Sequence, residues 1–148
     1  MNLLAPVSRI MTTDLVTVNE KDKLSAVKNI FDEKKIHHIP VVNGTKMVGI
    51  ISKQDFLYFL HGFTKNGKVM GVEALESTSC HTIMTTGLAK LEPASRINVA
   101  LEVFKENLFH ALPVVDGEEL VGIITTYDII SRIAEEPITL EDYKDTSQ

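Results

Sequence analysis

Residues 37–55 of the chain read HHIPVVNGTKMVGIISKQD, and residues 110–128 read HALPVVDGEELVGIITTYD. The two stretches lie 73 positions apart and align without a gap. The same offset pairs the sequence IMTT at residues 10–13 with IMTT at residues 83–86. A repeat with a fixed period is evidence about architecture before any propensity is considered. Two copies predict a pseudo-symmetric pair of similar units rather than a solenoid.

Each copy opens with a predicted strand and a predicted amphipathic helix. In the first copy, residues 15–18 predict the strand, and apolar residues at helical spacing predict a helix over residues 23–35. Asp22 is predicted to be the N-cap of this helix, and Ser95 is predicted to cap the matching helix of the second copy. Upstream, a short helix is predicted to run into Ile10.

The repeated stretch itself predicts a β-hairpin followed by a second helix. Apolar, β-prone runs flank Asn43-Gly44 in the first copy and Asp116-Gly117 in the second, and both dipeptides are typical of hairpin turns. Ser52 and Thr125 then begin the closing helix of each copy. The sequence therefore predicts an α/β (α+β-like) fold. Two β-α-β-β-α units, each with helices on one face of a small sheet, pack as a pseudo-twofold pair.

The predicted organisation has four segments. Residues 7–61 form the first repeat, residues 62–78 a linker with one helical turn near its end, and residues 79–134 the second repeat. Residues 135–148 form an acidic tail that is predicted to be loosely packed. A unit of about 50–60 residues is marginally stable alone. We therefore expect the two repeats to share one core.

Composition excludes several classes of protein. The chain has 148 residues, of which 44% are hydrophobic, and its net charge is −5. A negative charge argues against non-specific binding to nucleic acid, which needs clustered cations. No apolar run is long enough to cross a membrane, and the start resembles no signal peptide. One cysteine, Cys80, cannot form an internal disulfide, which favours a cytoplasmic location.

The motif GIISKQD and its partner GIITTYD have two interpretations. Ser52 with Asp55, and Thr125 with Asp128, have the spacing of a capping box at a helix start. The same residues suit a nucleotide site, because a helix N-terminus attracts phosphate and an aspartate can accept hydrogen bonds from both ribose hydroxyls. A capping box favours the longer Glu or Gln. The shorter Asp in both copies therefore favours a second role for this residue.

Histidines precede each hairpin, and other reactive residues are isolated. His37 and His110 occupy equivalent positions, with His38 beside the first. No Cys/His spacing supplies a zinc site, and no motif of a hydrolase, protease or P-loop enzyme is present, so no metal and no catalytic role are predicted. Cys80 is interpreted as an incidental thiol. Arg132 is expected to pair with the aspartate one turn earlier, or to reach a phosphate in the second cleft.

These residues resemble a known family, the cystathionine-β-synthase (CBS) domain pair or Bateman module. The resemblance rests on IMTT with LVTV, KKIHHIPVV and GIISKQD, and on their partners IMTT with LAKL, LFHALPVVD and GIITTYD. It covers about residues 7–134. It implies two ligand clefts related by a pseudo-twofold axis and frequent assembly into a homodimer. It also implies regulatory binding of AMP, ADP or ATP, and in some members of S-adenosylmethionine or NAD.

The resemblance also implies site residues. In the first cleft it implies a strand-one threonine with its neighbour, the residues before the proline, and the Ser and Asp of the motif: Thr17, Val18, His37, His38, Ile39, Ser52 and Asp55. In the second cleft the matching residues are Lys90, His110, Ala111, Leu112, Thr125 and Asp128. Arg132 is added to this cleft from its position one turn after Asp128, and not from the resemblance. Lys90 departs from the pattern by replacing the threonine. This departure indicates a second cleft that has a different ligand or no adenine.

The sequence supports two functional hypotheses. The first is a non-catalytic module that binds an adenine nucleotide, forms a homodimer and signals to a separate regulated protein. The second is a protein-interaction or dimerisation scaffold whose clefts are unoccupied. The Ser/Thr and Asp positions are present in both copies, which favours the first hypothesis.

Overall fold

The computed structural model describes residues 1–62 and 72–139. The first half contains these elements in order: η1 (Val7–Arg9), β1 (Val18–Asn19), α1 (Leu24–Glu33), β2 (His38–Asn43), β3 (Lys46–Ser52) and α2 (Lys53–His61). The second half contains η2 (Val72–Glu76), α3 (Cys80–Ile83), α4 (Ile97–Asn107), β4 (Ala111–Asp116), β5 (Glu119–Thr125) and α5 (Thr126–Ala134). The predicted helical turn of the linker is η2. Residues 63–71 of the linker and residues 140–148 of the tail lie outside the described residues.

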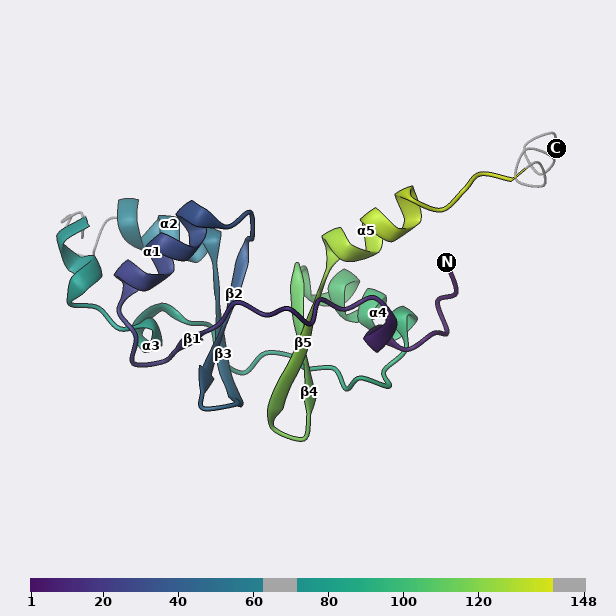
Figure 1. Cartoon of the computed structure of the whole chain (residues 1–148), viewed down its shortest axis with the longest axis horizontal. Coiled ribbons are helices and arrows are strands. Elements are labelled where there is room, and N and C mark those ends of the chain that lie inside the picture. The colour runs from purple at the N-terminus through teal and green to yellow at the C-terminus, as the bar shows by residue number, and fades with distance from the viewer. Residues whose placement is uncertain (63–71, 140–148) are drawn as a thin grey trace.

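The two hairpins form as the repeated stretch predicts. Strands β2 and β3 pair antiparallel, as do β4 and β5, and each pair has an irregularity at the same place in its register. Gly44 and Gly117 adopt φ values of +66° and +64° in the two turns, a conformation that costs glycine little. Both hairpin turns lie on the same side of the molecule, and α2 and α5 begin on the opposite side (Figure 1).

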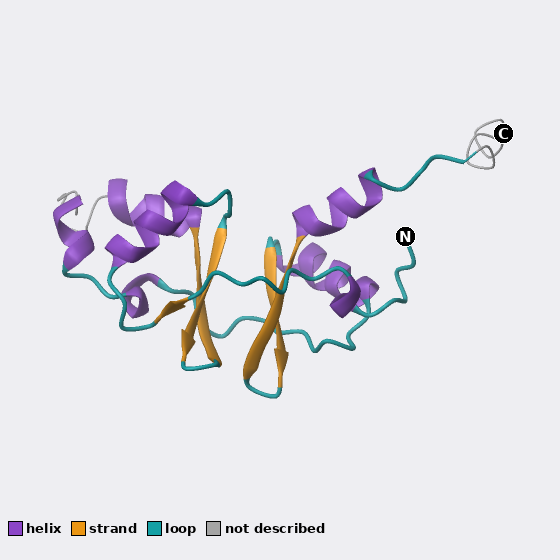
Figure 2. Ribbon diagram, viewed as in Figure 1, coloured by secondary structure: helices purple, strands orange, loops and turns teal. Residues whose placement is uncertain are grey.

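The hairpins stand at the centre of the molecule, and the helices lie outside them (Figure 2). The strand order is β1-β2-β3-β5-β4, and β3 pairs with β5 only at Lys46 and Glu119. One apolar cluster lies inside each unit, and a third joins them. That third cluster contains buried Met47 and Ile50 from β3 with Val115 and Ile123 from the other hairpin. This arrangement confirms the predicted mixed α/β pair with a shared core.

The segment at the start of each repeat, which contains Val7 in the first copy and Cys80 in the second, packs on the other repeat. We call these two segments the leading segments. Val7 is fully buried in the cluster of the second unit, and its amide donates to the carbonyl of Ser95 (2.7 Å). Cys80, 73 positions later, is fully buried in the cluster of the first unit, and its amide donates to the carbonyl of Asp22 (2.8 Å). Figure 1 shows the N-terminal segment crossing the hairpins on its way from η1, beside α4, to β1. The exchange of segments ties the two units together.

The exchanged segments also explain a glycine in each hairpin. Thr12 and Ile123 exchange two backbone hydrogen bonds (2.8 and 3.0 Å), so the first IMTT segment lies beside β5. A Cβ at Gly122 would lie 2.5 Å from Met11 Sδ, and one at Gly49 would lie 2.8 Å from Met84 Sδ. A side chain at either position would displace the methionine of the opposite IMTT segment, and at Gly49 it would also crowd the backbone carbonyl of Thr85 (3.0 Å).

The N-caps predicted for α1 and α4 are wrong. The helices begin one residue later than predicted, with Lys23 and Arg96 in the cap position and no side-chain cap. Asp22 instead accepts a hydrogen bond from the amide of Asn19 (2.8 Å). Similarly, Ser95 Oγ accepts from the amide of Glu92 (3.0 Å).

The exchanged segments replace those caps. Leu24 N donates to Thr78 O (2.9 Å), and Ile97 N donates to Ala5 O (3.0 Å). Backbone carbonyls from the opposite leading segment therefore satisfy amides that a side-chain cap normally satisfies. The first predicted strand is also shorter than expected, because β1 pairs with β2 only at Val18 and Asn19.

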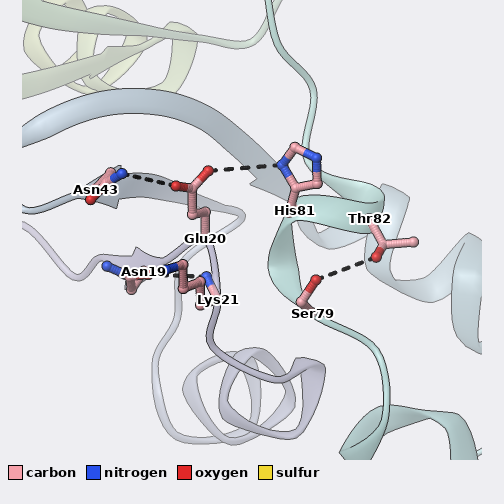
Figure 3. A network of polar contacts seen from close by, with 7 residues as sticks. All are labelled: Asn19, Glu20, Lys21, Asn43, Ser79, His81 and Thr82. Carbon is pink, nitrogen blue, oxygen red and sulfur yellow. Dashed lines mark hydrogen bonds and ion pairs between the residues drawn. The ribbon is translucent and has the colours of Figure 1, made fainter.

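A polar network joins β1, the first hairpin and α3 (Figure 3). Glu20 Oε1 accepts from Asn43 Nδ2 (3.0 Å), and Glu20 Oε2 lies 3.8 Å from His81 Nδ1. Beside it, Ser79 Oγ and Thr82 Oγ1 are 3.5 Å apart. The network fixes the exchanged α3 segment against the first unit.

Candidate functional site

A groove of about 740 Å³ opens where the two hairpins meet the N-termini of α2 and α5. Eight residues predicted from the sequence line it: His37, His38, Ser52, Asp55, His110, Ala111, Thr125 and Asp128. One groove therefore contains both motifs, whereas the sequence resemblance implied two clefts. Its volume lies within the range of small-molecule sites, about 300–1,000 Å³.

Six predicted site residues lie outside this lining. Ile39 and Leu112 are buried in the two cores, at 0% and 1% exposure, because they are the inward residues of β2 and β4. Val18 is buried in β1, while three polar side chains, Thr17, Lys90 and Arg132, are exposed elsewhere. A ligand role for these six residues stays a prediction.

Both motifs form capping boxes. Asp55 N donates to Ser52 Oγ (3.0 Å), and Ser52 N donates to Asp55 Oδ2 (3.4 Å). Asp128 N donates to Thr125 Oγ1 (3.1 Å), and Thr125 N donates to Asp128 Oδ2 (2.7 Å). Asp therefore does reach back to the cap amide, so its short side chain is no evidence against capping. The length of the side chain therefore does not distinguish capping from a second role, and a ligand role for the two aspartates stays a prediction.

The two boxes differ in how much of the carboxylate they use. Asp128 Oδ2 also accepts the Thr125 hydroxyl at 2.8 Å, so this oxygen has two short hydrogen bonds. Asp55 has one reciprocal bond of 3.4 Å, which is long for an N–H···O hydrogen bond. Asp55 is therefore the freer of the two carboxylates to accept hydrogen bonds from a ligand.

Arg132 does not make the expected ion pair with Asp128. None of the ion pairs found among residues 1–62 and 72–139 includes this arginine. Asp128 faces its own cap residue, and the arginine side chain is exposed on α5. The i,i+4 interpretation was therefore wrong.

Three histidines from both repeats converge on the groove. Burial lowers the pKa of His38, and the positive charges of His110 and His37 lower it further, while Asp55 raises it. The coupling of His38 with His110 places side chains of the two repeats within electrostatic reach. A phosphate bound between them would favour protonated imidazoles.

This shift predicts a pH dependence of folding. The pKa of His38 is lower in the folded state than the ordinary value of about 6.5, so the unfolded chain binds the proton more readily. Stability should be complete above about pH 6.5 and should fall as pH drops below it toward the folded pKa. One proton limits the slope to about 1.4 kcal/mol per pH unit. Urea denaturation at several pH values measures this slope.

His38→Ala is the matched variant, because Ala111 occupies the equivalent position of the second repeat. We expect the variant to lose less stability than the wild-type protein between about pH 6.5 and pH 5. His61→Ala, at the exposed end of α2, controls for the removal of a histidine. Equal slopes in wild-type and His38→Ala proteins would contradict the prediction.

Several lining residues were not predicted. Thr12 and Thr85 reach the groove because the exchanged IMTT segments lie beside β5 and β3. Their repetition at the 73-residue offset was a signal that the sequence offered. Lys35 and Lys53 in the first repeat, with aromatic residues in the second, also line the groove.

The remaining reactive residues do not form a second site. Cys80 is buried, and burial together with the negative charge of Asp22 raises its pKa to about 11. His81 faces Glu20 instead (Figure 3). Within the described ranges, no three His, Cys, Asp or Glu side chains are grouped closely enough to hold a metal ion. In the same ranges, no helix has the length and hydropathy needed to cross a membrane.

Comparison with known proteins identifies the fold and its repeats. The family model for the CBS domain matches residues 7–62 and residues 80–135. The chain belongs to the CBS domain family. The predicted resemblance is thereby confirmed, and the chain carries two tandem CBS domains.

Curated relatives of this CBS domain pair are longer proteins. A homoserine O-acetyltransferase of Methanohalobium evestigatum is 30% identical over 88% of this chain, which spans 24% of that protein. An inosine-5'-monophosphate dehydrogenase of Thermoplasma acidophilum is 28% identical over 83% of this chain, which spans 22% of that protein. The chain thus corresponds to about a quarter of the length of these relatives.

Solved CBS structures share the fold. A CBS domain of a membrane protein from Sphaerobacter thermophilus has a TM-score of 0.74 and 26% identity, and covers 87% of this chain and 88% of its own. The CBS domain pair of protein MJ0100, in complex with 5'-methylthioadenosine and S-adenosyl-L-methionine, has a TM-score of 0.73 and 22% identity. CBSX2 in complex with AMP has the same two values. Each of the last two covers 88% of this chain and 97% of its own.

Proposed function

We propose that this CBS domain pair is a non-catalytic regulatory module that binds an adenosine-containing ligand in the groove. The observation that carries the proposal is the meeting of two capped helix N-termini and three histidines in one groove of ligand size. Helix N-termini and imidazoles favour phosphate, and Asp55 and Asp128 can accept hydrogen bonds from ribose hydroxyls. AMP, ADP and ATP are the first candidates, followed by S-adenosylmethionine and NAD.

Two related structures support the ligand class. The pair of protein MJ0100 binds 5'-methylthioadenosine and S-adenosyl-L-methionine, and CBSX2 binds AMP. All three ligands contain adenosine. The relatives named above include enzymes, but this pair corresponds to only part of their length. The proposal therefore assigns regulation, and not catalysis, to the pair.

The module would transmit its ligand state to a separate protein. Ligand binding shifts an equilibrium only through different affinity for two arrangements. Strands β3 and β5 have one residue pair in β register, so the two hairpins can change their relative arrangement at this short pairing. A homodimer is part of the proposal, because apolar side chains Leu57, Tyr58, Ile130 and Ile133 are exposed on α2 and α5. A cytoplasmic location completes it, since one buried cysteine suits a reducing compartment.

Thermal unfolding with each ligand tests the proposal. A ligand at 100 times its dissociation constant adds about 2.7 kcal/mol to the stability of the native state. For a chain of this length the Tm should rise by roughly 5–10 °C. AMP, ADP, ATP, NAD and S-adenosylmethionine are compared, each with and without magnesium, and GTP serves as the control for adenine.

A flat response to every ligand would favour the second candidate function, a dimerisation or protein-interaction scaffold. The exposed apolar residues of α2 and α5 are the observation that favours this alternative. Under it, the oligomeric state should be independent of nucleotide. Sedimentation with and without AMP or ATP then separates the two functions.

A further inference from the structure

We propose that the groove is divided into two chemically different halves, and that phosphate groups bind only in the half formed by the first repeat. The half formed by the second repeat takes an uncharged aromatic or apolar group. This inference rests on the proposed nucleotide function and specifies how the groove uses it.

The division appears when lining residues at equivalent positions are compared. Lys35 in the first half corresponds to Leu108 in the second, and Lys53 corresponds to Thr126. Each half has one motif aspartate. The first half therefore sets two lysines against one carboxylate, whereas the second has a carboxylate and no lysine. Charges of opposite net sign face the two ends of the same groove.

The two lysines are available to a ligand. The ion pairs of the described ranges include neither Lys35 nor Lys53. Lys53 is the first residue of α2, so its side chain adds to the partial positive charge of the helix N-terminus. His38 lies in this half, where the second repeat has Ala111. A helix N-terminus and one histidine, His37 or His110, are present in both halves. The two lysines and His38 have no counterpart in the second half, so they make the first half the end that attracts an anion.

The second half offers apolar and aromatic surface in place of these cations. Tyr127 replaces Gln54, and Phe109 replaces Ile36 at the equivalent positions. Tyr127 and Leu108 are 75% and 81% exposed, although both line the groove. Exposed apolar surface inside a groove is covered when a flat aromatic group stacks on it, as nucleobases stack on aromatic side chains.

The backbone of the second half supports the difference. Leu108 is the C-cap of α4 and adopts the left-handed conformation, with φ of +53°, and its amide donates to Phe104 O (3.1 Å). The C-cap of the equivalent helix α1 is Lys34, whose backbone is extended. The segment before His110 therefore follows a different path from the segment before His37. The halves differ in shape as well as in charge.

The test exchanges the lysines between the two halves. Each residue is replaced by the residue found at the equivalent position of the other repeat. Lys35→Leu with Lys53→Thr gives the first half the character of the second. Leu108→Lys with Thr126→Lys does the reverse. Calorimetric titrations with adenosine, AMP, ADP and ATP then report affinity and stoichiometry at two salt concentrations. Lys105→Leu, on an exposed lysine of α4 outside the groove, controls for loss of charge.

We expect wild-type protein to bind one ATP per chain tightly, with affinity rising from AMP to ATP and falling with salt. The Lys35→Leu/Lys53→Thr variant should lose at least about tenfold in ATP affinity, the effect of one charged hydrogen bond, and should lose less for adenosine. The Leu108→Lys/Thr126→Lys variant should bind a second ATP. Melting curves establish that each variant is folded.

The outcomes distinguish the division of the groove into two halves from nucleotide binding itself. Two equal ATP sites in wild-type protein, or unchanged ATP affinity in the Lys35→Leu/Lys53→Thr variant, would overturn the division and leave nucleotide binding intact. Absence of binding by all four ligands would overturn the division. It would overturn the proposed function as well if NAD and S-adenosylmethionine also left the Tm unchanged.

Discussion

Replacing Val7 by aspartate should destabilise the second repeat, although Val7 is the first residue of the first repeat. The side chain is fully buried against α4, β4 and β5, so the substitution places an unpaired charge in that core. An uncompensated buried charge costs on the order of 3–5 kcal/mol. Urea denaturation measures the loss. Amide hydrogen exchange locates it, because protection reports the local free energy of opening.

Cys80→Asp is the reciprocal variant, since Cys80 is 73 positions later and fully buried in the first unit. We expect Val7→Asp to lower protection first in α4, β4 and β5, and Cys80→Asp to lower it first in α1, β2 and β3. Leu4→Asp, at a side chain that is 61% exposed, serves as the surface control. Loss of protection first in the repeat to which each residue belongs in sequence would refute the exchange of segments.

The sequence predicted the elements that depend on local patterns. Asn43-Gly44 and Asp116-Gly117 determine their turns within a few residues. Each capping box likewise joins two residues that are three positions apart in the sequence. Such contacts are short in sequence, so the spacing of residues carries the information. The hairpins and the closing helices were therefore predicted close to their observed bounds.

The exchange of leading segments was not predictable from the repeat. Two similar copies give two similar sets of apolar residues, and similarity does not decide on which copy a segment packs. Asp22 and Ser95 were misassigned for this reason, because carbonyls of Thr78 and Ala5 supply what the caps would have supplied. Thr12 and its partner were absent from the predicted site because they reach it only through the exchange.

The candidate site was predicted where its residues belong to the hairpins and to the starts of the closing helices. The predicted ion pair between Arg132 and Asp128 was wrong because the Asp128 carboxylate accepts local hydrogen bonds from Thr125 instead. The contrast between Lys35 and Leu108 was readable in the aligned copies. Its consequence for ligand binding followed only once the structure showed that both residues line one groove.

Replacing Asp55 by alanine should abolish most nucleotide binding at small cost to stability. If its carboxylate accepts two hydrogen bonds from ribose, each worth about 1.5–3 kcal/mol, affinity should fall by a factor on the order of 100 or more. The reciprocal cap bond that is lost measures 3.4 Å and contributes little to α2. Titration calorimetry measures the affinity, and urea denaturation measures the stability.

Asp128→Ala should lower stability more, and nucleotide affinity less, than Asp55→Ala does. Its carboxylate accepts bonds of 2.7 and 2.8 Å from the cap residue, so the variant should lose about 1–2 kcal/mol of stability. Its effect on affinity should be smaller, because an oxygen already engaged in the box has less capacity for a ligand. Asp14→Ala, at an exposed residue outside the groove, controls for removal of a carboxylate.

The two variants together separate capping from ligand binding, which the motif alone leaves open. If both aspartates only cap helices, each variant loses stability in proportion to its hydrogen bonds and nucleotide affinity is unchanged in both. That result would refute nucleotide binding through the motif. If Asp55 binds ribose, affinity and stability respond to different residues, because the repeat with the weaker box is the one whose carboxylate faces the ligand.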